Sequence, residues 1–380
     1  MIASLILAVA FEKIALVDSL DFARLRDVET EKGTIEVLDW VCASHPTAIA
    51  WRDRSGGLTR FASAEEPSAS VAASLDKRYL PREDAWGWLK MANPALDAYK
   101  VVFEECDRRG LVRAIHNDFE EFHWGLTSLW NYEHPQFWCK PYGANRWAGH
   151  CSLAYPEVRA HKLRYLDELL AKKPSLVFLD MWRAGQWSPA VEYVWPNLEK
   201  WRARYGAEPV PKDPTNPRWL DLIGENVEGY LRAYSAKCRA AGARLVIGFK
   251  EFDVGEKLIR ETYAIDWKKL AAEKVFDGFA VMGVPPNAED PFGAIRRALD
   301  YARENLSGTP LYSAVSMYNM RKVGIPELRR LTKLSNGEIA KRLIALAKEA
   351  GCAGVVMECV DGGNYPADVN DALIKGEKDN

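Results

Sequence analysis

The sequence predicts an α/β protein, a (β/α)8 TIM barrel with long, aromatic-rich βα loops. A recurring unit carries this prediction: an amphipathic stretch, a glycine (Gly110, Gly242 and Gly351) and a short apolar run. Apolar runs of this kind are typical of parallel strands buried on both faces. Eight runs alternate with helix-like stretches along the chain, which favours a closed barrel.

The expected strands share a short apolar centre and follow a helix-like stretch or a turn signal. They lie near 13–17, 47–52, 111–116, 175–180, 244–250, 276–282, 310–316 and 353–358. An open doubly wound sheet is the main alternative fold. No Gly-x-Gly-x-x-Gly motif follows the first strand, however, and the number of strands fits closure better.

Helix ends agree with this division of the chain. The three glycines suit the left-handed position just past a helix. Pro156 is expected at a first helical position, and Ser335 with Glu338 has the spacing of a capping box.

We expect residues 1–380 to form one catalytic barrel domain with two rim insertions, at about 54–95 and 117–155. Connections of this length are usually functional or disordered. The second insertion is rich in Phe, Trp and Tyr, which is not the composition of a disordered segment. We therefore expect it to fold over the barrel mouth.

The overall composition limits which binding partners can be expected. The formal net charge is -2 and the hydrophobic content is 48%, so nothing favours nucleic acid or a membrane as partner. The seven cysteines are scattered, odd in number and without a Cys-x-x-Cys pair. This pattern favours packing of single thiols over a disulfide scaffold or a zinc site.

The first ten residues are apolar like the core of a secretion signal, but no Lys or Arg precedes them. They are too short to span a bilayer. A trimmed signal, a buried segment and a cloning remnant all fit, so a cytoplasmic and an exported protein both remain open.

Two expected strands end in carboxylates, Asp180 and Glu251. The carboxyl ends of barrel strands form the rim where active sites are built. Arg183 would favour an ionised Asp180, suited to act as nucleophile or base, whereas apolar neighbours could keep Glu251 protonated as an acid. Glu358 ends the last strand and is a third candidate. The structural alternative is an ion pair of Asp180 with Arg183 and a solvated Glu251.

The third strand runs into a segment from His116 to His123 that contains two histidines and three acids. With Asp180 these side chains could hold Zn²⁺ or Mn²⁺. The spacing matches no recognised ligand pattern, and the first strand lacks a His-x-His. We therefore expect no metal or other cofactor, and favour substrate contacts from His116 and Asn117.

Aromatic residues are a second functional signal. The chain has 14 Trp and 15 Tyr, and Trp182, Trp187, Tyr193 and Trp195 directly follow Asp180. Flat rings beside carboxylates suit sugars, whose C–H faces stack on aromatic rings. Ordinary loop packing is the alternative for any one of these residues.

The chain resembles the family 10-like glycosyl hydrolase group of bacterial TIM-barrel proteins, from about residue 33 to 360. The matching passages are 48–57, 116–121, 134–138, 155–159, 179–183 and 213–219. The resemblance implies a barrel acting on glycosidic bonds in carbohydrates, with Asp180 as the acid of strand four. By analogy with other sugar-cleaving barrels, Glu251 on strand five would be its partner, although fold alone does not establish function.

The leading hypothesis is a glycoside hydrolase that degrades a poly- or oligosaccharide with two carboxylates, Asp180 and either Glu251 or Glu358. The residues expected to contact the sugar are Arg52, His116, Asn117, Glu120, Trp182, Arg183, Trp187 and Asp361. One alternative is a metal-dependent barrel isomerase or deacetylase that uses His116, His123 and Asp180. A second is a carbohydrate-binding barrel without catalytic activity.

Overall fold

The structure is a computed structural model of the 380-residue chain. It describes residues 11–18, 30–55, 58–59, 61–66, 96–119, 128–144, 150–181, 187–250, 256–282, 289–316, 325–359 and 367–375.

A closed barrel of parallel strands forms the centre of the molecule, in the spatial order β1-β10-β9-β8-β7-β6-β5-β2. Pairing of β2 with β1 completes the ring. The strands are β1 (Glu12–Val17), β2 (Ala48–Arg52), β5 (Val112–Asp118), β6 (Leu176–Asp180), β7 (Arg244–Lys250), β8 (Gly278–Met282), β9 (Leu311–Ser316) and β10 (Gly354–Cys359). The predicted (β/α)8 fold is confirmed, and each strand end lies within two residues of its expected position.

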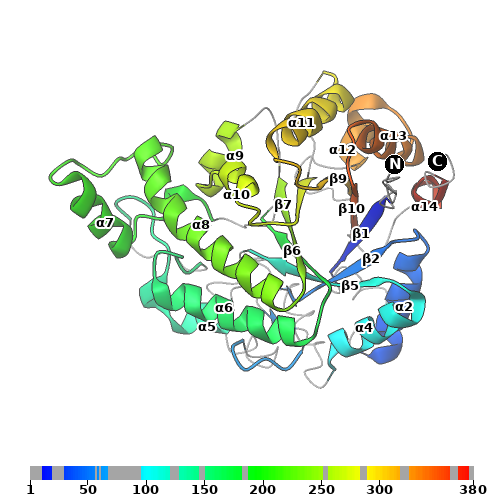
Figure 1. Cartoon of the computed structure of the whole chain (residues 1–380), viewed down its shortest axis with the longest axis horizontal. Helices are drawn as coiled ribbons and strands as arrows, with labels where there is room; N and C mark the ends of the chain where they lie inside the picture. The colour runs from blue at the N-terminus through cyan, green and yellow to red at the C-terminus, as the bar shows by residue number, and fades with distance from the viewer. Residues whose placement is uncertain are drawn as a thin grey trace, which may run out of the picture.

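Helices surround the barrel, and α7 lies farthest from it, at the left of Figure 1. The helices are α2 (Glu31–Cys42), α4 (Ala98–Arg109), α5 (Leu129–Glu133), α6 (Pro156–Ala171), α7 (Trp195–Tyr205), α8 (Pro217–Ala240), α9 (Glu256–Tyr263), α10 (Trp267–Ala272), α11 (Pro291–Asn305), α12 (Ile325–Thr332), α13 (Asn336–Glu349) and α14 (Ala367–Lys375). Short 3₁₀ turns form at η3 (Pro135–Phe137) and η4 (Pro189–Val191).

Helix ends follow the sequence signals. Gly110, Gly242 and Gly351 have φ of 68°, 73° and 70°, the left-handed conformation that glycine adopts without steric cost. Pro156 is the first residue of α6. Ser335 caps α13, and its capping box with Glu338 is complete. These expectations are confirmed.

The barrel interior is a separate apolar cluster built from strand residues. Its buried members come from all eight strands, and the two members that β1, β2 and β6 each contribute are two residues apart: Ile14, Leu16, Ala48, Ala50, Ala114, Leu176, Phe178, Val246, Ala280, Tyr312 and Val356. Residues at the intervening positions belong to a larger cluster shared with the helices. The alternation therefore shows which strand residues face inward.

Glu12, Arg244 and Tyr312 form a polar cluster at the amino-terminal ends of the strands. Two guanidinium nitrogens of Arg244 donate to the two carboxylate oxygens of Glu12 at 3.0 and 3.1 Å, and the Tyr312 hydroxyl donates to Glu12 at 3.1 Å. Because these residues come from β1, β7 and β9, the cluster connects distant strands at the amino-terminal end of the barrel.

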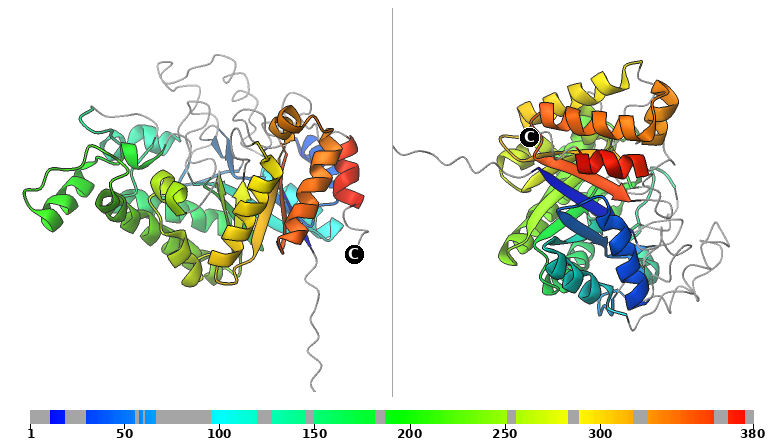
Figure 2. Two further views of the ribbon diagram at one scale, coloured as in Figure 1. Left: turned by 90° about the horizontal axis from the view of Figure 1, so that it is seen from above. Right: turned by 90° about the vertical axis from the view of Figure 1, so that its right-hand side faces the viewer.

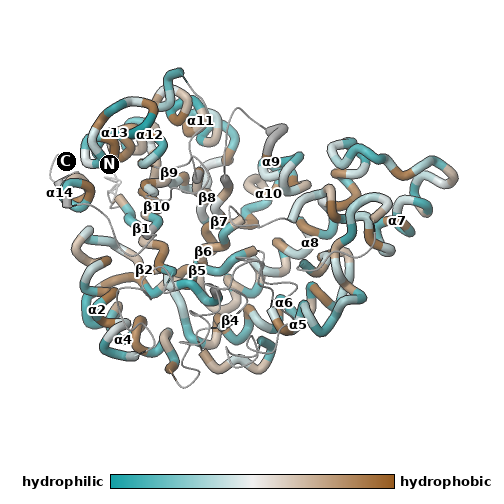
Figure 3. The backbone as a smooth tube through the Cα atoms, turned by 180° about the vertical axis from the view of Figure 1, so that it is seen from behind, coloured by the Kyte–Doolittle hydropathy of each residue, from teal (hydrophilic) through white to brown (hydrophobic). Residues whose placement is uncertain are grey.

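The helices pack their apolar faces on the outside of the barrel. Trp267 of α10 is fully buried against Phe279 of β8, whereas Trp219 of α8 is fully buried against Tyr193 and against Trp201 of α7. Full burial of a large apolar side chain stabilises a fold by about 1.5–3 kcal/mol. In Figure 3 the helices alternate between brown and teal along their length, as expected when one face contacts the strands and the other faces water.

The two expected insertions are described in part. A two-stranded antiparallel pair, β3 (Arg54–Ser55) with β4 (Leu58–Thr59), begins the first insertion. At the start of the second insertion, strand β5 continues to Asp118 because its polar residues still pair with β6. The later part of that insertion packs against the β6–α7 connection, where Lys140 donates to Val191 and Tyr193 donates to Lys140. Folding over the barrel mouth stays a prediction.

The side chains of six of the seven cysteines are described, and they carry thiols that form no disulfide with one another. None of the helices in the described ranges combines the length and the apolar composition needed to cross a membrane.

Candidate active site

Polar residues replace the apolar layer at the carboxyl ends of the strands. Asp18, Arg52, His116, Asp180 and Glu358 each follow an inward-facing apolar residue by two positions. The period of two along a strand therefore directs them into the barrel mouth. All five are at most 3% exposed. The structure thus brings four of the predicted site residues to one end of the barrel interior and adds Asp18.

Asp118 joins this layer because it lies two residues beyond His116 on the same face of β5. Arg52 forms ion pairs with Asp18 through Nη1 and with Asp118 through Nη2. One planar guanidinium thus holds two carboxylates in place, a geometry that Lys cannot reproduce.

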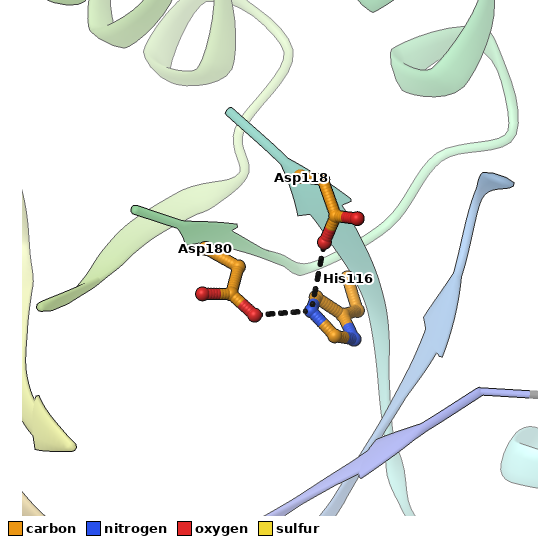
Figure 4. A group of neighbouring side chains, drawn as sticks. All are labelled: His116, Asp118 and Asp180. Atoms are coloured by element: carbon orange, nitrogen blue, oxygen red, sulfur yellow. Dashed lines mark hydrogen bonds and ion pairs between the residues drawn. The ribbon is translucent and has the colours of Figure 1, made fainter. Parts of the chain in front are cut away.

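Two carboxylates face the same nitrogen of the His116 imidazole (Figure 4). Its Nε2 is 2.9 Å from Oδ2 of Asp180 and 3.4 Å from Oδ1 of Asp118. His116 and Asp118 come from β5, and Asp180 comes from the neighbouring strand β6. The ring of Phe178 meets the imidazole edge to face, with the centroids 5.9 Å apart and the planes at 82°.

Glu358 supplies a further buried carboxyl group to the same end of the barrel. It is 1% exposed, and its Oε2 accepts a hydrogen bond from the Ser316 hydroxyl at 2.6 Å. β9 and β10 place these two residues opposite each other in the register of the sheet. The donor fixes the orientation of the carboxyl group.

Asn117 lies on the opposite face of β5 from His116. Its Nδ2 donates to Asp53 at 2.8 Å, and the Tyr234 hydroxyl of α8 donates to its Oδ1 at 2.8 Å. Burial raises the pKa of Tyr234 well above its usual range, so this hydroxyl stays protonated. The structure does not bring Asn117 together with His116, and substrate contact from Asn117 stays a prediction.

Trp187 is buried and donates its indole N–H to Glu192 at 2.8 Å. Glu192 also accepts hydrogen bonds from Ser152 at 2.5 Å, from Asn197 at 3.1 Å and from Cys139 at 3.4 Å. Burial raises the pKa of the Glu192 carboxyl, and these donors act in the opposite direction. The group ties the second insertion to the segment that follows Asp180.

The aromatic residues after Asp180 divide into buried and exposed rings. Tyr193 is 4% exposed and stacks on Trp219 with the centroids 4.6 Å apart. Trp195, at the start of α7, is 61% exposed and has the guanidinium of Arg202 over its ring. Packing thus accounts for Tyr193, whereas Trp195 presents a ring to solvent.

Several predicted site residues lie outside the described part of the chain. They are Glu120, His123, Trp182, Arg183, Glu251 and Asp361. Their roles as expected from the sequence stay predictions.

The described residues offer one set of side chains that could hold a metal ion. One ligand atom each from His116, Asp118 and Asp180 lies within 4.8 Å of the others. Imidazole and carboxylate groups suit Zn²⁺ or Mn²⁺. Of the predicted ligands, His116 and Asp180 belong to this set together with Asp118, and His123 lies outside the described residues.

Asp18 and Ser316 were not among the site residues predicted from the sequence, and Asp118 was included only as one of three acids in the 116–123 segment that could hold a metal ion. For Asp118 the signal was present, because it follows His116 by two residues within one strand. Asp18 and Ser316 directly follow or end apolar strands, as Asp180 does. Their roles depend on partners on neighbouring strands, which a single strand does not identify.

Comparison with solved structures gives the same fold. The chain is similar to the PgaB (BpsB) glycoside hydrolase domain from Bordetella bronchiseptica, with a TM-score of 0.63, 11% identity, and coverage of 96% of this chain and 99% of that one. It is also similar to a class V chitinase from Pseudomonas fluorescens, with a TM-score of 0.53, 12% identity and coverage of 97% and 99%.

A β-galactosidase from Marinomonas ef1 matches with a TM-score of 0.59 and 10% identity over 97% of this chain, which spans 59% of the β-galactosidase. At these identities the likeness establishes a barrel fold shared with glycoside hydrolases. No protein-family model matches the sequence, and no curated protein matches it. The narrower resemblance to the family 10-like group stays a prediction.

Proposed function

We propose that this chain is a glycoside hydrolase that cleaves glycosidic bonds in a poly- or oligosaccharide, with Asp180 as nucleophile or base. The supporting observation is the pair of buried carboxyl groups, Asp180 and Glu358, on inward-facing positions at the carboxyl ends of β6 and β10. Glycoside hydrolysis uses two such groups around an oxocarbenium-like transition state.

The environments of the two carboxyl groups suit different roles. Asp180 faces the imidazole of His116, whose ring nitrogen can donate a hydrogen bond to a carboxylate. Glu358 faces a neutral hydroxyl, that of Ser316. We therefore propose Glu358 as the general acid, with Glu251 as the other candidate for this role.

The test measures reducing ends released by the full chain from a panel of polysaccharides. Asp180→Asn and Glu358→Gln are each expected to lower kcat by about a hundredfold or more, as for loss of a proton-transfer group. Glu251→Gln separates the two acid candidates. Glu199→Gln makes the same chemical change at a half-exposed position of α7 and is expected to keep kcat within about threefold, because surface substitutions of this kind perturb the fold little.

Wild-type turnover in folded Asp180→Asn protein would contradict the role of Asp180. Binding of a glycan without release of reducing ends over long incubation would contradict hydrolysis altogether.

A metal-dependent isomerase or deacetylase is the second candidate function. The convergence of His116, Asp118 and Asp180 favours it, because these side chains could hold a divalent cation and the cation would activate a water molecule or polarise a sugar carbonyl. The same activity assay after chelation and metal analysis distinguishes the two functions. Full activity of metal-free protein excludes the second.

A further inference from the structure

A continuous row of charged side chains crosses four neighbouring strands at the barrel mouth. It runs from Asp18 after β1 to Arg52 on β2, then to Asp118 and His116 on β5, and ends at Asp180 on β6. β1, β2, β5 and β6 are consecutive neighbours in the barrel. Every member is at most 5% exposed, so water competes little with these contacts.

We propose that Arg52 and Asp118 are positioning residues, which hold His116 so that its Nε2–H donates to Asp180. This inference rests on the proposed function and extends it. It assigns roles to two residues that need not touch the substrate.

The direction of the hydrogen bond follows from the acceptors. Nε2 of His116 lies 2.9 Å from one carboxylate and 3.4 Å from another, and ionised carboxylates only accept. Nδ1 is buried and has no hydrogen-bond partner among the described residues. A proton on Nε2 is therefore satisfied, whereas a proton on Nδ1 alone would be unpaired and two carboxylates would face a lone pair.

The orientation of the ring needs a support beyond Asp180. The χ2 rotation of histidine has broad, roughly two-fold preferences, so a ring flip is available unless contacts prevent it. Phe178 restricts the ring plane from one side. Asp118 restricts which nitrogen faces the carboxylates, and Arg52 holds the other oxygen of Asp118.

The experiment compares Arg52→Lys with Arg244→Lys. The first variant keeps the positive charge and loses the guanidinium fork at the mouth. The second makes the same change at the other end of the barrel, where Arg244 contacts Glu12. Asp118→Asn is the second variant, and it removes the charge next to His116 while keeping the side-chain shape.

Two readouts separate positioning from a structural role. In the presence of a chelator, ¹⁵N NMR of histidine-labelled protein reports the protonated nitrogen, and His116→Gln assigns the signal. We expect Nε2–H in the wild type and in Arg244→Lys, and a mixture with Nδ1–H in Arg52→Lys and Asp118→Asn. For turnover, we expect Arg52→Lys to lower kcat by about tenfold or more with KM within about twofold, because the lost interaction acts in the transition state.

Nδ1–H in the wild type, or an unchanged Nε2–H signal in both mouth variants, would overturn the inference. So would wild-type kcat in folded Arg52→Lys protein. The NMR measurement needs no substrate, so it can succeed if no glycan is cleaved. The expected NMR signals without cleavage of any glycan would contradict the proposed hydrolase activity and leave the positioning roles of Arg52 and Asp118 intact.

Discussion

Glu192 is a buried carboxyl group whose protonation the structure constrains. It is 2% exposed and accepts hydrogen bonds from side chains on three separate segments of the chain. Burial is the largest influence on its pKa and raises it above the ordinary value of 4.5. Below that value the carboxyl is protonated in both the folded and the unfolded chain.

The pH dependence of stability follows from this elevation. Because the folded chain binds the proton more tightly than the unfolded chain, the stabilisation is fully present at low pH and is lost as pH rises through the folded pKa. Glu192→Gln removes the titration. The free energy of unfolding of the wild type, relative to this variant, is therefore expected to fall with rising pH by about 1.4 kcal/mol for each unit of pKa elevation.

Urea unfolding of the wild type and Glu192→Gln, from below pH 4.5 upward, measures the difference in their free energies of unfolding. Glu199→Gln, the same change at a half-exposed position of α7, is expected to leave the trend of the wild type unaltered. A wild type that gains stability over Glu192→Gln as pH rises would contradict the raised pKa.

Within a single helix, the surrounding packing decides whether replacing a glycine by alanine stabilises or destabilises the fold. Gly224 and Gly229 both lie in α8, but a Cβ at Gly224 would collide with the backbone carbonyl of Ala264, whereas a Cβ at Gly229 meets nothing within 4 Å. Gly224→Ala is therefore expected to lower the free energy of unfolding by about 1–3 kcal/mol, the usual cost of overpacking. Gly229→Ala is expected to raise it by up to about 1 kcal/mol through helix propensity.

Thermal or urea unfolding of the two variants checks this pair. Equal effects of both substitutions, in either direction, would show that α8 does not approach the Ala264 backbone as described.

Strands and helix ends could be predicted because their signals are local. The run 175–180 is apolar, follows a helix pattern, and ends at Asp180, so its place at the rim needed no knowledge of distant residues. The same local pattern led to Glu358. The ion pair of Asp118 with Arg52 depends on the register of β2 with β5, which cannot be predicted from the local sequence. The sequence also placed Asp118 in a loop starting at 117, whereas strand β5 continues to Asp118 although its residues become polar.

In the whole molecule, three buried thiols lie beside different parts of the barrel, so their reactivity can follow the unfolding of each part. Cys106 lies in α4, Cys238 lies in α8, and Cys352 precedes β10. Burial raises the pKa of each thiol to about 12, so the reactive thiolate is scarce in the folded protein. Exposure of any one of these cysteines to a thiol reagent therefore requires opening of its part of the structure.

The closed ring of strands makes partial opening costly. Every barrel strand pairs with two neighbours, so removing one arc would leave two unpaired edges. We expect the single domain inferred from the sequence to unfold cooperatively, and the three cysteines to become reactive over the same range of urea concentration. Pulsed alkylation followed by mass spectrometry measures each midpoint separately. A lower midpoint at Cys352 than at Cys106 and Cys238 would show that the β9–β10 arc opens independently, and would divide the chain into more than one folding unit.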